Sequence, residues 1–444
     1  MNRASSWFLA VLAWGHVCSA HASDLPDVGE TELVFGSDAV EFVDSMLIAY
    51  DPAYPQNHAA RVVRLDSLAH TLFDREAAGE DLDCSRQLFV EAKWLVNYTA
   101  WWSKIDARLD ELEGSFAIED QSFADDMSPI DQLWGRCNQA EFIKLEATLE
   151  ELFVLADRFQ LPRETVRTED WLETPEDYRN YLESLVIGEP AISGEDHRSR
   201  LGSITGILSA AYKKPKLIGF IRLATGRPVP EDVQQDALQQ TFMDFVDRWQ
   251  DPETGYWGAW YRYNDKIYRT ADLSYTYHII HARRGDVDHW PQIIETTFAM
   301  RDQTYPYGWL SNGKWNNHNN YDVARIFHYG WEYLDADQQT DIAELMQEMI
   351  DWCFENTVMP SYEGFRYNPE LGGSLGAELY FGVSFLDAVD YFKDEPWFGD
   401  IDRPAAPGDV CENLMRYAAR LDDDTYVAGA LAKLRRNCEP LIDG

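Results

Sequence analysis

The chain has 444 residues, of which 77 are acidic and 38 are basic, so its formal net charge at pH 7 is −39. Such an acidic surface disfavours nucleic acid and anionic membranes as partners. Hydrophobic residues make up 45% of the chain, enough to bury a large core in one or two domains.

The first 22 residues have the pattern of a signal peptide. Arg3 precedes an apolar stretch that begins at Trp7, and small residues then lead to an Ala-His-Ala cleavage site at 20–22. This apolar run is shorter than the roughly 20 residues of a membrane-spanning helix, and no later segment is long and apolar enough. The pattern predicts export to the periplasm or the medium, without stable membrane insertion.

Export permits disulfides, so the cysteines that remain after cleavage bear on the fold. Cys411 and Cys438 flank one helical segment and form the favoured pair, and a bond between Cys84 and Cys137 is a further candidate. Cys353 lies on an apolar helix face, which indicates a buried thiol. No cysteine or histidine spacing fits a zinc site, so neither a metal nor a cofactor is expected.

Residues 23–190 are predicted to form an N-terminal helical region. Apolar residues recur there at helical period, in segments separated by polar breaks that contain proline. The predicted helices are 36–50, 57–77, 83–114, 129–158 and 174–187. A Gly-bearing polar stretch at 188–200 indicates a boundary or a long loop before the second region.

The second region, residues 191–444, repeats one unit with a period in the fifties. Each copy has an amphipathic helix, a loop rich in glycine and aromatic residues, and a more apolar helix with an acid near its start. The amphipathic helices are 230–249, 290–301 and 337–356; the loops are 251–258, 305–310 and 360–366; the acids are Asp272, Asp322 and Glu378.

This repeat is typical of stacked helical hairpins. Hairpins that close into a ring form an α/α toroid, in which the apolar helices line the inside and the loops gather at one end around a cleft. The predicted fold class is therefore all-α, an α/α toroid that is complete or incomplete. An open α-solenoid is the alternative, and the Trp and Tyr residues of the loops favour the ring.

The densest polar cluster is at 313–321, directly before the second apolar helix. Capping a helix needs one polar residue, whereas this run has four asparagines and a histidine, so we prefer a functional role to a cap or a solvated loop. Aromatic rings stack on sugars, while amides and arginine bind hydroxyls and carboxylates. The candidate substrate-binding residues of the loops are Trp257, Trp260, Asn264, Trp315, Asn316 and Tyr367.

Two stretches resemble a known family. Residues 316–321, Asn-Asn-His-Asn-Asn-Tyr, look like the Asn-Asn-His-x-Tyr motif of α/α-toroid alginate lyases. Residues 364–371, Gly-Phe-Arg-Tyr-Asn-Pro-Glu-Leu, are similar to that family's Gly-Phe-x-Pro-Asn-Glu-Leu stretch. The helix that follows, from Leu379 to Phe392, lies where the family carries its catalytic tyrosine.

The resemblance implies β-elimination at a uronic acid. Asn317 would neutralise the C5 carboxylate, His318 would assist it or act as base, and Tyr380 would be base, acid or both. The family places an arginine about seven residues before the tyrosine, where this chain has Gly373. Arg366 is the candidate substitute.

The sequence therefore predicts an exported lyase that acts on a polysaccharide or oligosaccharide. Other interpretations remain open. Two of the helix-start acids, with Glu253, Glu363 or Glu370, would suit a glycoside hydrolase, although acids at helix starts also suit the helix dipole. A non-catalytic glycan-binding protein would need the aromatic residues only. Residues 251–258 also resemble the repeats of terpene cyclase toroids.

Overall fold

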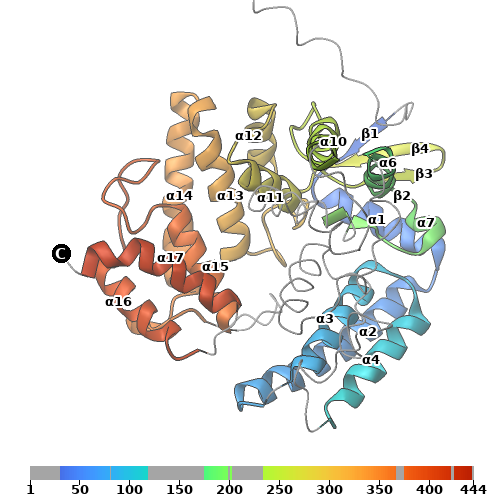
Figure 1. The fold of residues 1–444 in the computed structure, drawn as a ribbon, viewed down its shortest axis with the longest axis horizontal. Coiled ribbons are helices and arrows are strands. Elements are labelled where there is room, and N and C mark those ends of the chain that lie inside the picture. The colour runs from blue at the N-terminus through green and yellow to red at the C-terminus, as the bar shows by residue number, and fades with distance from the viewer. Residues whose placement is uncertain are drawn as a thin grey trace, which may run out of the picture.

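The computed structural model describes residues 31–80, 82–118, 175–198, 201–202, 234–366, 375–421 and 425–442. The described chain is mostly helical, as predicted, but it also contains one small sheet (Figure 1). The predicted signal peptide, the predicted helix 129–158 and Tyr367 lie outside the described residues. None of the described helices combines the length and the hydropathy that crossing a membrane would require.

The N-terminal helices follow the prediction with one exception. They are α1 (Ser37–Tyr50), α2 (Tyr54–Ala77), α3 (Asp83–Tyr98), α4 (Trp102–Ser115), α6 (Pro175–Val186) and the short α7 (Pro190–Ser193). The predicted helix 83–114 is interrupted between α3 and α4. At the break Thr99 has an extended backbone and forms a β-bridge with Glu195, so the helix cannot continue through it.

A four-stranded mixed sheet corrects the all-α prediction. Its strands are β1 (Thr31–Val34), β2 (Ile187–Gly188), β3 (Trp260–Tyr263) and β4 (Lys266–Thr270), in the order β1-β4-β3-β2. β3 and β4 form an antiparallel hairpin, and the two outer strands run parallel to their neighbours. Asn264 and Asp265 at the turn both have positive φ, as a tight hairpin turn requires.

The second region alternates outer and inner helices, as the repeat predicts. The outer helices are α10 (Gln234–Trp249), α12 (Trp290–Ala299), α14 (Ala336–Asn356) and α16 (Pro407–Ala418); the inner helices are α11 (Leu273–Arg283), α13 (Asn317–Gly330), α15 (Leu375–Ala388) and α17 (Thr425–Ile442). A short 3₁₀ helix follows α13 at Trp331–Tyr333, and another follows α14 at Pro360–Tyr362. Successive inner helices pack on one another, and the hairpins form an arc (Figure 1).

Two hydrophobic cores divide the described chain. The larger core contains the hairpin array together with residues of α1, such as Met46, and of α6, such as Leu182. The smaller core lies between α2, α3 and α4. The cores therefore do not follow the predicted boundary at residue 190, because two helices of the N-terminal region belong to the larger core.

The Gly-aromatic loops are packing elements. At Gly258 a Cβ atom would lie 1.8 Å from the carbonyl oxygen of Thr270, so only glycine allows the loop to approach the sheet. The aromatic neighbours turn inward, and Trp257, Trp309 and Phe365 are all almost fully buried. These rings anchor each loop to the core.

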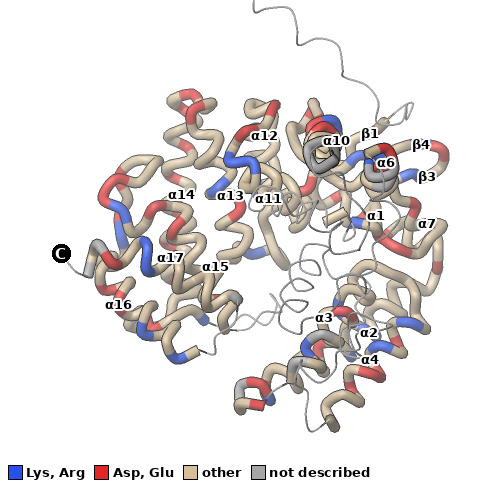
Figure 2. The backbone as a smooth tube through the Cα atoms, in the orientation of Figure 1, with Lys and Arg blue, Asp and Glu red and all other residues tan. Residues whose placement is uncertain are grey.

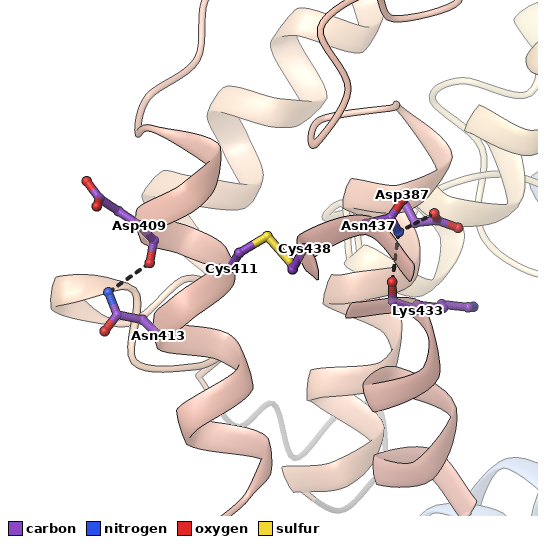
Figure 3. Close-up of a disulfide and its surroundings, with 7 residues drawn as sticks. All are labelled: Asp387, Asp409, Cys411, Asn413, Lys433, Asn437 and Cys438. Carbon is purple, nitrogen blue, oxygen red and sulfur yellow. Dashed lines mark hydrogen bonds between the residues drawn. A yellow bond between two sulfur atoms is a disulfide. The ribbon is translucent and has the colours of Figure 1, made fainter. Parts of the chain in front are cut away.

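The predicted disulfide between Cys411 and Cys438 is present and joins α16 to α17 (Figure 3). Cys84 is also disulfide-bonded, and its predicted partner Cys137 lies outside the described residues. Cys353 is a buried free thiol, as predicted, and burial raises its pKa to about 12.

Removing the Cys411–Cys438 bond is expected to lower the free energy of unfolding by about 3.5 kcal/mol, because the bond restricts the unfolded chain. The two cysteines are separated by 27 positions. Urea denaturation of Cys411→Ala, Cys438→Ala and the double variant would measure the loss. All three should lose about the same amount, since each lacks the same bond, whereas additive losses would contradict this explanation.

Candidate functional site

The starts of three inner helices lie together at one end of the array. Asp272, the N-cap residue of α11, is close enough to Asp322 of α13 to raise the pKa of that carboxyl. The ring of His318 in α13 lies 4.4 Å from the ring of Phe381 in α15. This is the end at which the repeat predicts a cleft.

Asn316 and Asn319 hold the start of α13 in place. The side chain of Asn316 caps the helix by accepting the backbone N–H of Asn319 at 2.8 Å. The amide of Asn319 donates to the carbonyl of Trp309 at 2.7 Å. Asn316 is only 3% exposed, so its predicted role in substrate binding is wrong in this structure and capping accounts for it.

The start of α13 and the third loop both contact Thr357, the C-cap residue of α14. Asn317 donates from Nδ2 to Thr357 Oγ1 at 3.0 Å, and the backbone N–H of Arg366 donates to the Thr357 carbonyl at 2.7 Å. Asn317 is buried, and its Oδ1 has no hydrogen-bond partner in the described structure. The exposed side chain of Arg366 forms no ion pair with any described residue.

His318 is the accessible residue of the Asn-rich motif. Between Asn316 and Ala324, a stretch that is described throughout, every other residue is buried, whereas the side chain of His318 is 25% exposed. Its ring lies between Tyr305 and Phe381, at centroid distances of 5.9 Å and 4.4 Å. Its Nε2 is 3.8 Å from Asp322 Oδ2.

A group of tyrosines lies near Asp322, the acid beside this histidine. Tyr277 of α11 and Tyr321 of α13 pack edge to face with centroids 5.2 Å apart, and burial raises the pKa of both phenols. Burial also raises the pKa of Tyr380 in α15. Tyr380 is therefore protonated at neutral pH, a state that suits a proton donor better than a base.

Lys433 of α17 lies beside Tyr380. Its Nζ is 4.3 Å from the centre of the Tyr380 ring and donates to Ser384 Oγ at 2.7 Å. A cation over the ring face stabilises this arrangement. Nothing in the sequence pattern indicated Lys433, because it comes from the last inner helix, far along the chain.

The two acids at the helix starts differ in their partners. Asp272 accepts the backbone N–H of Tyr275 at 3.0 Å and the Nε of Arg198 at 2.5 Å. Asp322 is fully buried, and neither of its oxygens has a hydrogen-bond partner in the part of the chain that the structure describes. Burial raises the pKa of Asp322 well above its usual value, and the charge of Asp272 raises it further.

The predicted contribution of the first loop is not found at this site. Trp257 is fully buried and donates from Nε1 to the carbonyl of Val246 at 2.8 Å, so the prediction that it stacks on a sugar is wrong. Trp260 is 8% exposed and belongs to the core. Asn264 is exposed at the turn of the β3–β4 hairpin, which lies at the far side of the arc from α15 (Figure 1).

Trp315 points to an outer helix. Its ring lies 6.3 Å from that of Trp352 in α14, in an edge-to-face arrangement, and Arg301 lies 6.0 Å above it. Asn317 and the backbone of Arg366 meet through Thr357, whereas Trp257 is in the core.

A cavity of about 570 Å³ lies at the other ends of the inner helices. Asp387 borders it and accepts hydrogen bonds from Arg325 at 2.6 Å and Asn437 at 2.7 Å. Arg436 also pairs with Asp387. Acids and bases balance each other in this lining. Across the described chain, acidic positions are spread over most elements with basic positions among them (Figure 2).

No protein-family model, curated protein sequence or solved structure matches this chain. Its class is therefore defined by fold and site alone. It is an array of helical hairpins with a mixed sheet, in which acid–base side chains gather where the inner helices begin.

Proposed function

We propose that this protein is an exported polysaccharide lyase that cleaves a uronic-acid-containing polymer by β-elimination. Its described hairpins would be part of an α/α toroid. The observation that carries the proposal is the position of His318, which is accessible between two aromatic rings and lies 3.8 Å from the buried acid Asp322. Tyr380 interacts electrostatically with the same acid.

In the proposed reaction, His318 takes the proton from C5 of the uronic acid. The electron pair moves into the carboxylate and then forms the C4–C5 double bond as the bond from C4 to the leaving oxygen breaks. Tyr380 gives its proton to that oxygen. The raised pKa of Tyr380 supports this division of roles between base and acid.

Arg366 would supply the positive charge that neutralises the substrate carboxylate. Its side chain is exposed, and its backbone is tied to the same threonine as Asn317. Asn317 is 2% exposed and donates to Thr357, so it would hold this threonine in place while Arg366 binds the carboxylate. Arg–carboxylate contacts are strong because they combine charge with two parallel hydrogen bonds.

Sugar hydrolysis has less support than elimination. A glycosidase needs two accessible carboxyl groups. Asp272 is fully buried as a helix cap and ion pair, and Asp322 is fully buried as well. Glu253 is exposed but is paired with Arg269 at 2.8 Å.

Incubation with polyuronates is expected to produce unsaturated ends. The new C4–C5 double bond is conjugated with the carboxylate, so ultraviolet absorbance should rise together with new reducing ends. New reducing ends without that absorbance would indicate a hydrolase instead of a lyase. Binding of the polymer with neither signal would indicate a non-catalytic glycan-binding protein.

A further inference from the structure

Asp322 is an unusual buried group. Buried carboxyl groups in folded proteins are normally hydrogen-bonded or paired, because burying one alone is costly. Asp322 is fully buried, and both of its oxygens are unpartnered in the described structure. Asp272, at the equivalent place in the preceding repeat, has an arginine and a backbone N–H as partners.

Within the described residues, titratable groups from several elements face Asp322. They are Asp272 and Tyr277 from α11, Tyr305 from the loop before α13, His318 and Tyr321 from α13, and Tyr380 from α15. Burial raises the pKa of all four tyrosines, so they stay neutral at physiological pH. Asp272 is ion-paired with Arg198.

Among these described groups, His318 is the one whose charge can change near neutral pH. The two residues are one helical turn apart on α13, and Nε2 of His318 is 3.8 Å from Oδ2 of Asp322. Hydrogen bonds are shorter than this, but a small rotation of either side chain would close the gap. A proton on the imidazole would then give the buried carboxylate a counter-ion.

We propose that Asp322 is a positioning residue for His318 and that the two side chains titrate as one pair. Asp322 accepts Nε2–H of the imidazole, and Nδ1 is the nitrogen that gains and loses the proton. When Nδ1 accepts a proton, the pair becomes an imidazolium and a carboxylate side by side. Its role in catalysis rests on the proposed function, whereas the pair itself can be tested without substrate.

The test is a titration of the histidine ring signals by NMR, in the wild type and in Asp322→Asn, with His318→Gln to assign the signal. The asparagine can still accept from Nε2–H but carries no charge. Because a nearby carboxylate favours the charged imidazole, the apparent pKa of His318 should fall by about one unit in Asp322→Asn. An unchanged pKa would overturn the proposal.

Asp390→Asn is the matched control. Asp390 is a buried acid after the end of α15, where it faces His328 and pairs with Lys393 at 2.8 Å. This variant should leave the His318 titration unchanged. Urea denaturation of both variants at pH 7 would check that they are folded.

Enzyme kinetics separate this proposal from the proposed function. If the wild type is a lyase, the acid limb of its kcat/KM profile should move with the NMR pKa in Asp322→Asn. If the His318 pKa shifts but the protein has no lyase activity, the Asp322–His318 pair is supported and the proposed reaction is wrong. If the protein is a lyase but the pKa does not shift, the reaction is supported and the pair is wrong.

Discussion

His318→Ala is expected to lower the rate of polymer cleavage by roughly 100-fold to 10,000-fold, the usual contribution of a general base. The unfolding free energy should change by about 1 kcal/mol or less, because the side chain is 25% exposed and its partners remain in place. Initial rates of double-bond formation and urea denaturation would measure the two effects.

His278→Ala is the matched control for this variant. His278 is a partly exposed histidine on the neighbouring inner helix α11, and its ring lies 4.9 Å from that of Tyr277. Its loss should affect the rate only slightly. Equal losses of activity in the two variants, or a His318→Ala protein that is strongly destabilised, would contradict the assignment of His318 as base.

Asn317→Ala cannot serve the same purpose. Asn317 is 2% exposed and donates to Thr357, so its removal should lower both stability and activity. Burial of Asn317 is the reason for the expected loss of stability.

Arg198→Met is expected to lower the free energy of unfolding by about 3–5 kcal/mol, the usual result of breaking a buried ion pair from one side. Arg198 donates from Nε to Asp272 at 2.5 Å and from Nη1 to Tyr98 of α3 at 3.3 Å. The variant would leave the fully buried Asp272 charged and close to Asp322. Denaturation in urea would measure the loss.

This loss should depend on pH. Burial raises the pKa of Asp272, and the guanidinium of Arg198 opposes that rise. Without Arg198 the folded-state pKa rises further above the unfolded value of about 3.9. The free energy of unfolding of the variant is then highest at a pH below about 3.9. As the pH rises toward 7, the difference in this free energy between the wild type and the variant becomes larger.

Two further variants complete the experiment. Arg198→Met with Asp272→Asn should recover part of the loss, because the buried charge is gone. Arg301→Met removes one side of an exposed ion pair with Glu348, 2.7 Å long, and should cost less than about 1 kcal/mol. A deficit in Arg198→Met that does not vary with pH would indicate lost packing instead of an unpaired charge.

Periodic features of the sequence predicted the hairpin array well. Apolar residues at helical spacing report which side of a helix is buried, so α1, α12 and α14 lie within a few residues of their predicted bounds. The bond between Cys411 and Cys438 was predicted correctly, but where the sequence indicated one helical segment the structure has two helices, α16 and α17.

Features that depend on contacts distant in the chain were missed. β1 pairs with β4, more than 200 residues further on, and no local pattern reports such a pairing. The β3–β4 hairpin did have a local signal, since aromatic residues alternate toward the turn at Asn264 and Asp265. The sequence did not show whether the side chain of Trp257 points into the core or toward a binding surface, because a tryptophan beside a glycine is compatible with both.

The disulfide between α16 and α17 also bears on local opening. A stack of hairpins tends to open from its last units, which have a neighbour on one side only. Because Cys411 and Cys438 tie these two helices together, α17 can leave α15 only if α16 moves with it. Lys433 travels on α17 and lies over Tyr380, so the cross-link also governs how often that phenol is uncovered.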